Sequence, residues 1–225
     1  MIEPGDARPL LPRIGIFGGS FDPVHLGHLV PVEETRARLG LSEVVYLPAY
    51  CPPHKPSGPS APSHHRFAML ALALEPYRRF RLSDFEVARG GTTYTVETLR
   101  QMRALHPDGE IVLVIGSDAL VSFETWRAWR EIVQSHRFAV VHREPFDYLR
   151  TRDALGDDLR TRLAPEGATL DDAPDEATIF WGGNAPVTIS STWLRRAIPA
   201  GEDLKGSLPP SVEAYLRHHR LYRDP

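Results

Sequence analysis

Cysteine is nearly absent from this chain: among its 225 residues only Cys51 carries a thiol, which excludes an internal disulfide and indicates a reducing compartment. The chain also lacks any run of the roughly 18 consecutive apolar residues that a transmembrane helix needs. Its first 12 residues have no apolar core of the kind found in signal peptides, and we expect them to form a flexible tail. These absences predict a cytoplasmic protein without a membrane partner.

Positive charge is not in excess either. The formal net charge is −3, which argues against a nucleic-acid partner and leaves local groups to bind any anionic substrate. Lysine is rare, since only Lys55 and Lys205 stand among the 26 lysines and arginines. A chain that otherwise uses arginine can keep a lysine where a compact, mobile ammonium group is needed.

Short β-rich runs alternate with helical patterns along the chain. Strands are expected at residues 13–17, 43–47, 80–85, 110–115, 137–142 and 178–181. Helices are expected at 25–39, 65–74, 95–105, 126–133, 191–197 and 210–221, and the weak pattern of 143–177 suggests one more. This alternation predicts an α/β fold with a doubly wound parallel sheet. No internal repeat divides the chain, so we expect one domain over 13–225 with a small helical subregion from about residue 190.

A glycine pair and two histidines follow the first expected strand, in the sequence GGSFDPVHLGH. In a parallel α/β sheet, ligands bind beyond the carboxyl ends of the strands. Gly18 and Gly19 let the backbone approach an anion closely, and the helix expected to begin near His25 adds a favourable dipole. His25 and His28 are three residues apart and lie on one face of a first helical turn. Gly27 between them removes a side chain that would block a ligand.

Two common phosphate loops do not fit this segment. The glycines at 15, 18 and 19 do not match G-x-G-x-x-G, and no G-K-[ST] follows them, which excludes a dinucleotide fingerprint and a P-loop. The competing interpretation is an ordinary strand-to-helix turn with two surface histidines.

The order of motifs resembles the nicotinate-nucleotide adenylyltransferase family of the HxGH nucleotidyltransferase superfamily. The resemblance covers about residues 13–222, and its specific motifs are GGSFDPVHLGH at 18–28 and ISSTWLR at 189–195. Weaker matches are Pro53-His54-Lys55, Thr93-Tyr94-Thr95, Gly116-Ser117-Asp118 and Trp126. The chain departs from the family at Arg127, where tyrosine or histidine is common, and at Thr93, where serine is commoner.

The resemblance implies a Rossmann-like nucleotidyltransferase fold that transfers AMP from ATP to nicotinate mononucleotide and releases pyrophosphate. The attacking group is an ionised phosphate, so catalysis needs positioning and charge stabilisation rather than a general base or a covalent intermediate. His25 and His28 are expected at the α-phosphate, with His28 taking the larger share in the transition state. The residues expected to hold phosphate oxygens beside them are Gly18, Gly19, Ser20 and Phe21.

Other matched residues receive roles from the same resemblance. Ser191 and Thr192 at a helix start, and Arg195 one turn later, are expected to bind the leaving pyrophosphate; an N-capped amphipathic helix is the alternative. Lys55 is expected at the phosphates. Gly116 and Asp118 are expected at the ATP, with Asp118 accepting from a ribose hydroxyl or, alternatively, capping a helix. The residues expected to bind the mononucleotide are His54, Tyr94, Thr95 and Trp126, the last by stacking on the pyridine ring or else by packing in the core.

No metal site is expected in the chain itself, because the adjacent histidine pairs 64–65 and 218–219 point apart on a helix and lack zinc-like spacing. Magnesium is expected to arrive with ATP. Three rival interpretations remain: phosphopantetheine adenylyltransferase, a class I aminoacyl-tRNA synthetase fragment, and a nucleotide-sensing regulator without catalysis. The sequence fixes neither the oligomeric state nor the choice between the nicotinate and nicotinamide mononucleotides.

Overall fold

A computed structural model describes residues 11–53, 58–172, 174 and 176–223. Its centre is a sheet of six parallel strands in the order β3-β2-β1-β4-β5-β6. The strands are β1 (Arg13–Gly19), β2 (Glu43–Pro48), β3 (Phe80–Leu82), β4 (Glu110–Gly116), β5 (Arg137–Val141) and β6 (Ile179–Trp181). The expected doubly wound parallel α/β fold is confirmed.

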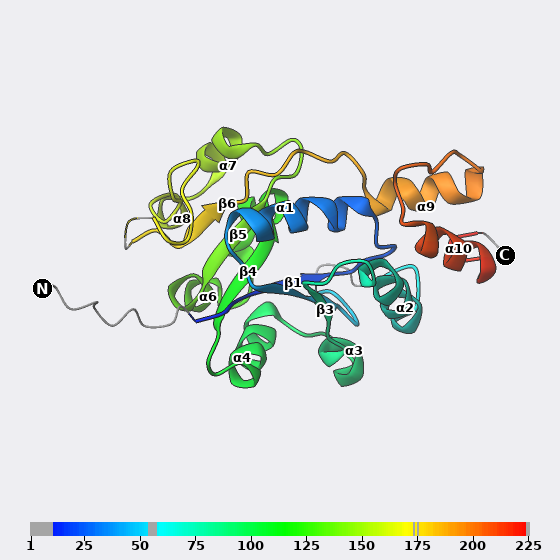
Figure 1. The fold of residues 1–225 in the computed structure, drawn as a ribbon, viewed down its shortest axis with the longest axis horizontal. Coiled ribbons are helices and arrows are strands. Elements are labelled where there is room, and N and C mark those ends of the chain that lie inside the picture. Colours follow the sequence, from blue (N-terminus) through cyan, green and yellow to red (C-terminus); the bar gives the residue numbers. More distant parts are fainter. Residues whose placement is uncertain (1–10, 54–57, 173, 175, 224–225) are drawn as a thin grey trace, which may run out of the picture.

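Helices cover both faces of this sheet (Figure 1). One face carries α1 (Val30–Arg38) and α2 (Ser63–Leu74), and buried residues of α9 (Ser191–Ala200) and α10 (Pro210–His218) join the same apolar cluster. The other face carries α4 (Thr95–Leu105), α5 (Ser117–Val121) and α6 (Trp129–Ser135). The remaining helices are α3 (Phe85–Arg89), α7 (Tyr148–Ala154), α8 (Asp157–Arg160) and the 3-10 turns η1 (Leu26–His28) and η2 (Phe123–Thr125).

The strands are apolar along their whole length because both faces of the sheet are buried. In β4, Ile111, Leu113 and Ile115 pack into the cluster with α4, α5 and α6. Val112 and Val114 point the other way and pack into the cluster with α1, α2, α9 and α10. Side chains that alternate between two buried faces give the continuous apolar runs that identified these strands in the sequence.

The direction of strand order reverses between β1 and β4, which are neighbours in the sheet although four α-helices and two strands separate them in the chain. Ligands of open α/β sheets bind beyond the carboxyl ends of the strands at such a switch point. Figure 1 shows α9 and α10 lying together at one end of the molecule, where α10 packs on α2. The fold therefore brings the two specific motifs, at 18–28 and 189–195, to the same edge of the sheet.

Four expected elements differ in the structure. The helix expected from His25 is replaced by the turn η1, and α1 begins only at Val30, where Pro31 favours a first turn. The strand expected at 80–85 ends at Leu82, because Phe85 already begins α3. The helix expected at 126–133 begins at Trp129, since Ala128 has a left-handed φ of 56°. The segment 143–177 contains two helices, α7 and α8, rather than one.

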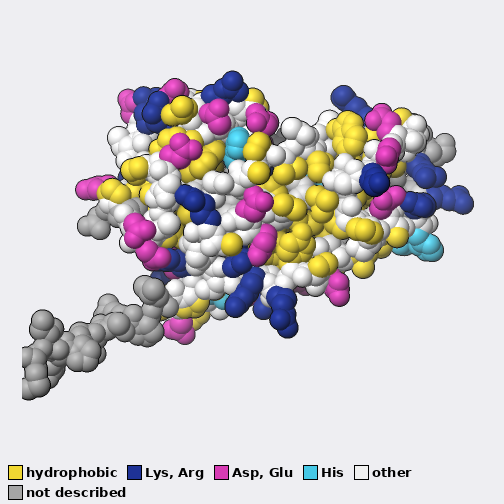
Figure 2. All heavy atoms as spheres, turned by 45° about the horizontal axis from the view of Figure 1, so that its top comes forward, with side chains coloured by type: hydrophobic (Ala, Val, Ile, Leu, Met, Phe, Trp, Pro, Cys, Tyr) yellow, Lys and Arg dark blue, Asp and Glu magenta, His cyan; other side chains and the backbone are white. Residues whose placement is uncertain are grey.

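The surface shows mixed charge. On the face drawn in Figure 2, acidic and basic side chains are interspersed and apolar side chains gather near the centre. Within the described residues, every helix is too short or too polar to cross a membrane.

Candidate active site

The expected histidine pair lies at the carboxyl end of β1. The rings of His25 and His28 are stacked, with centroids 3.7 Å apart and planes inclined by 29°. The backbone N–H of His25 donates to Nδ1 of His28 at 3.3 Å. In its neutral form His28 therefore carries its proton on Nε2, where it can be donated to an oxygen of a ligand. The side chains share one face as expected, although a 3-10 turn rather than an α-helix brings them together.

Buried groups hold this turn in place. Tyr46, which is fully buried in β2, donates its hydroxyl to the carbonyl oxygen of His28 at 2.9 Å. The ring of Phe21 meets the His28 ring edge to face, with centroids 5.2 Å apart. A Cβ on Gly27 would lie 2.9 Å from Nδ1 of His25. The structure thus gives Gly27 an additional reason to be glycine, because the His25 ring occupies the space beside it.

His25 is a neutral imidazole. It is only 2 % exposed, and burial lowers its pKa to about 3, with the positive charge of Arg143 as the second cause. Its Nδ1 is buried and has no hydrogen-bond partner in the part of the chain that the structure describes. A buried polar atom left without a partner costs free energy, which a bound ligand can recover.

Arg143 is a site residue that the sequence reasoning missed. It follows β5 directly and lies across the end of β4, where a Cβ on Gly116 would be 2.9 Å from its Cδ and 3.0 Å from its Nε. Ser117 fixes its backbone through two hydrogen bonds, to its N–H and its carbonyl. Nε of Arg143 is buried without a partner, and Arg143 forms no ion pair within the described residues. Its position directly after a buried strand was the signal available in the sequence.

Asp118 lies at the same edge as an exposed residue in the first turn of α5. A Cβ on Gly116 would come within 2.3 Å of its Oδ1, so Gly116 has to be glycine for the carboxylate to lie over the strand end. The residue at the cap of α5 is Gly116 and no side chain caps the helix, which removes the alternative role of Asp118 as a cap. Its proposed contact with a ribose stays a prediction.

The second specific motif packs directly on the histidine loop. The hydroxyl of Ser191 donates to the carbonyl of Pro23 at 2.9 Å, and NH1 of Arg195 donates to the carbonyl of Asp22 at 2.7 Å. NH2 of Arg195 also donates to Oγ1 of Thr192 at 3.2 Å. The expected N-cap of α9 is present, but it is Ser190, whose side chain accepts from the N–H of Trp193.

These contacts refine the expected phosphate roles on α9. The hydroxyl of Ser191 is engaged with the loop, so the backbone N–H groups of Ser191 and Thr192 at the start of the helix are the donors oriented for an anion. Arg195 holds the loop with one nitrogen, and its contact with pyrophosphate stays a prediction.

The residues expected at the mononucleotide lie near the amino end of α4. Tyr94 precedes α4, which begins at Thr95, and the guanidinium of Arg127 lies 4.5 Å above the Tyr94 ring. Trp126 is half-buried and packs on Phe123, with ring centroids 5.1 Å apart. The structure therefore brings the segment around Trp126 against the segment around Tyr94, as a shared pocket for one ring would require.

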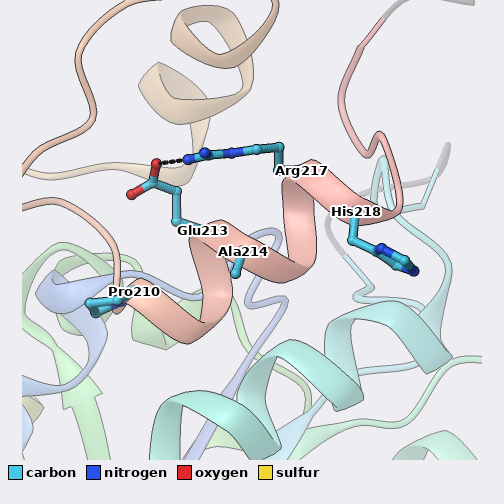
Figure 3. A pocket seen from close by; sticks show the side chains of 5 residues that line it. All are labelled: Pro210, Glu213, Ala214, Arg217 and His218. Atoms are coloured by element: carbon cyan, nitrogen blue, oxygen red, sulfur yellow. Dashed lines mark hydrogen bonds and ion pairs between the residues drawn. The ribbon is translucent and has the colours of Figure 1, made fainter.

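Other candidate residues do not contribute to the site that the structure describes. His54 and Lys55 lie outside the described residues. The expectation that the adjacent histidine pairs point apart is wrong: ring centroids are 4.3 Å apart for His64–His65 and 4.8 Å for His218–His219. The described residues contain no group of three or more His, Cys, Asp or Glu that could hold a metal ion. A surface hollow near His218 is lined only by residues of α10 and by none of the expected site residues (Figure 3).

Comparison with known proteins agrees with this geometry. The chain has the features of a nucleotidyltransferase: the strand order, the histidine turn at the switch point, and a helix start packed against that turn. The cytidylyltransferase-like family matches residues 16–197. A probable nicotinate-nucleotide adenylyltransferase of Symbiobacterium thermophilum is 38% identical over 93% of this chain and 95% of its own length. Another, from a Synechococcus species, is 39% identical over 95% of this chain and 96% of its own length.

Solved structures share the fold at lower identity. A nicotinic acid mononucleotide adenylyltransferase of Plasmodium falciparum, complexed with NaAD, has a TM-score of 0.69 at 19% identity and covers 94% of this chain and 97% of its own. A nicotinate-nucleotide adenylyltransferase structure from Vibrio parahaemolyticus has a TM-score of 0.63, also at 19% identity, over 95% of this chain and 97% of its own. The chain belongs to the nicotinate-nucleotide adenylyltransferase family, as the motifs indicated.

Proposed function

We propose that the chain catalyses its family's reaction in a single step at the carboxyl ends of β1 and β4. The phosphate of nicotinate mononucleotide attacks the α-phosphorus of ATP, the new P–O–P bond forms, and the bond to pyrophosphate breaks. Since the nucleophile is already ionised near neutral pH, no side chain has to remove a proton. The protein contributes the alignment of two anions and donors for the charge that develops on the α-phosphate.

Each side of the site supplies one part of this task. Nε2 of His28 is a hydrogen-bond donor toward the α-phosphate, and Arg143 supplies a positive charge beside His25. The free amides at the start of α9 offer an anion site for the pyrophosphate that leaves. The pair of segments around Tyr94 and Trp126 offers ring faces for the pyridine of the mononucleotide.

The observation that carries the proposal is the stacked imidazole pair of His25 and His28 beside Arg143, which forms no ion pair within the described residues. Charges and polar atoms buried without partners are costly in a resting protein, and they gather at functional sites. Nδ1 of His25 and Nε of Arg143 are both in this condition at the switch point of the sheet. An anionic ligand there would give both atoms a partner.

We further propose that magnesium enters as the complex with ATP. The ion would be held by phosphate oxygens and water, in keeping with its reluctance to shed its hydration shell. It would neutralise charge on the triphosphate, while the residues described above orient the α-phosphate.

A substrate panel with the purified chain tests the proposal. ATP is offered with nicotinate mononucleotide, nicotinamide mononucleotide or phosphopantetheine, and pyrophosphate release is followed. We expect release with nicotinate mononucleotide. Turnover only with phosphopantetheine would identify the rival enzyme, and ATP binding without turnover on any partner would indicate a nucleotide sensor. Either result would overturn the proposal.

A further inference from the structure

The carboxylate of Asp22 is buried next to the histidine turn and accepts hydrogen bonds from two other parts of the chain. Asp22 is 2 % exposed, and its Oδ2 accepts from the backbone N–H of Ser60 at 2.7 Å. Its Oδ1 accepts from the N–H of Ala61 at 3.0 Å and from the hydroxyl of Tyr222 at 2.6 Å. One side chain therefore joins the loop that carries the histidines to the segment before α2 and to the last turn of the described chain.

Tyr222 reaches Asp22 along an unfavourable backbone path. After α10 ends, Arg220 and Tyr222 both adopt left-handed conformations, with φ of 51° and 61°. Such conformations are unfavourable in residues other than glycine and persist where surrounding contacts over-determine them. Burial raises the pKa of the Tyr222 hydroxyl, and the negative charge of Asp22 raises it further. The phenol thus stays protonated and acts as a permanent donor.

The backbone carbonyls of Asp22 and its neighbour contact the α9 residues that we propose to lie at the phosphates. Its backbone carbonyl accepts from NH1 of Arg195 at 2.7 Å, and the next carbonyl, that of Pro23, accepts from the hydroxyl of Ser191 at 2.9 Å. Phe21, on the preceding side, has a left-handed φ of 47° and meets the ring of His28. The conformation of Asp22 therefore sets the spacing between the histidine turn and the start of α9.

We propose that Tyr222 is a positioning residue for AMP transfer. Its hydroxyl fixes the Asp22 carboxylate, and through Asp22 it fixes the distance between the donors on His28 and the anion site at the start of α9. This inference rests on the proposed function, because it assumes that those two groups bind adjacent phosphates of one ATP. It makes the end of the chain, 200 residues from Asp22, a part of the active-site framework.

The substitution Tyr222→Phe tests this, since it removes one hydroxyl and keeps the ring. Asp22 retains two backbone donors, so we expect the fold to persist. The turnover number should fall roughly tenfold, because small misplacements of reacting groups are costly in the transition state. The KM for the mononucleotide, which binds at the other side of the site, should stay within about twofold of the wild-type value.

Tyr215→Phe is the matched control. It removes a comparable hydroxyl from α10, where Tyr215 bonds to Nδ1 of His65 on α2 at 2.9 Å rather than to Asp22. We expect a loss of melting temperature similar to that of Tyr222→Phe, with turnover unchanged. Full turnover of Tyr222→Phe, or equal losses of turnover in the two variants, would show that Tyr222 only stabilises the fold.

Binding of ATP, measured by calorimetry, separates this inference from the proposed function. If the wild-type chain binds ATP but turns over no mononucleotide, the proposed function fails. The positioning role then stands only if Tyr222→Phe binds ATP several-fold more weakly than Tyr215→Phe. A wild-type chain that does not bind ATP would overturn both.

Discussion

Arg195 donates a hydrogen bond to the backbone carbonyl of Asp22 although 173 residues separate the two in the chain. The two sequence motifs that identify the family are therefore one structural unit. In the proposed reaction, the histidine turn supplies donors for the α-phosphate, and α9 supplies the start of a helix for the rest of the triphosphate.

The stability of the protein should depend on pH through His25. Burial lowers its folded pKa from 6.5 to about 3, so between these values the unfolded chain binds a proton that the folded chain does not. Stability is then lost as the pH falls below 6.5, by about 2 kcal/mol between pH 7 and pH 5 from this residue. Urea unfolding across this range should show a shallower decline for His25→Gln. Equal slopes would contradict a buried neutral imidazole.

Two glycines of β1 should respond to alanine in opposite ways. A Cβ on Gly18 would meet no atom within 4 Å, so Gly18→Ala should keep its melting temperature but raise the KM for ATP, because the methyl group enters the space assigned to phosphate. A Cβ on Gly15 would lie 2.9 Å from Cγ2 of Val114, so Gly15→Ala should lose about 1–3 kcal/mol of stability. Thermal melts and initial rates on both variants check this. An unchanged KM for Gly18→Ala would place the phosphate elsewhere.

Removing the positive charge of Arg143 should impair ATP use without unfolding the chain. Arg143→Gln deletes a charge that no carboxylate pairs within the described residues, and kcat/KM for ATP should fall by roughly 10- to 100-fold. Arg152→Gln is a control, since that arginine is exposed and pairs with its neighbour Asp153. Steady-state rates at varied ATP provide the measurement. Equal kinetics in the two variants would remove Arg143 from the site.

Trp126 should act mainly on the mononucleotide. The substitution Trp126→Ala removes a half-buried ring, and the KM for the mononucleotide should rise roughly 5- to 30-fold, the equivalent of about 1–2 kcal/mol of cation–π and stacking contact. The KM for ATP should change little. A lowered melting temperature with an unchanged KM for the mononucleotide would assign Trp126 to the core through its packing on Phe123.

The fold was predictable from the sequence where local patterns decide it. β4 is buried on both faces, and its apolar run could be recognised without any partner. The predicted helix boundaries were wrong where the backbone conformation of one residue overrides the hydrophobic pattern. The left-handed Ala128 delays α6 until Trp129, and no hydrophobic period reveals this.

Within the site, the sequence identified donors that belong to motifs and missed those that depend on the fold. His25 and His28 are three residues apart in the sequence, so their position on one face followed from that spacing, whereas the stacking of their rings is a finding of the structure. The contact between Asp22 and Tyr222 joins residues 200 apart, and it depends on tertiary packing such as that of α10 on α2. Arg143 could have been found, because it follows a buried strand at the carboxyl edge.

The rate of pyrophosphate release by His28→Ala, with ATP and nicotinate mononucleotide, tests the central claim most directly. His64→Ala serves as the control, because His64 is an exposed histidine on α2. We predict that His28→Ala keeps the folded structure, by circular dichroism and melting temperature, and loses roughly 10²- to 10³-fold in turnover while the control keeps full activity. A folded His28→Ala variant that releases pyrophosphate at nearly the wild-type rate would contradict the account.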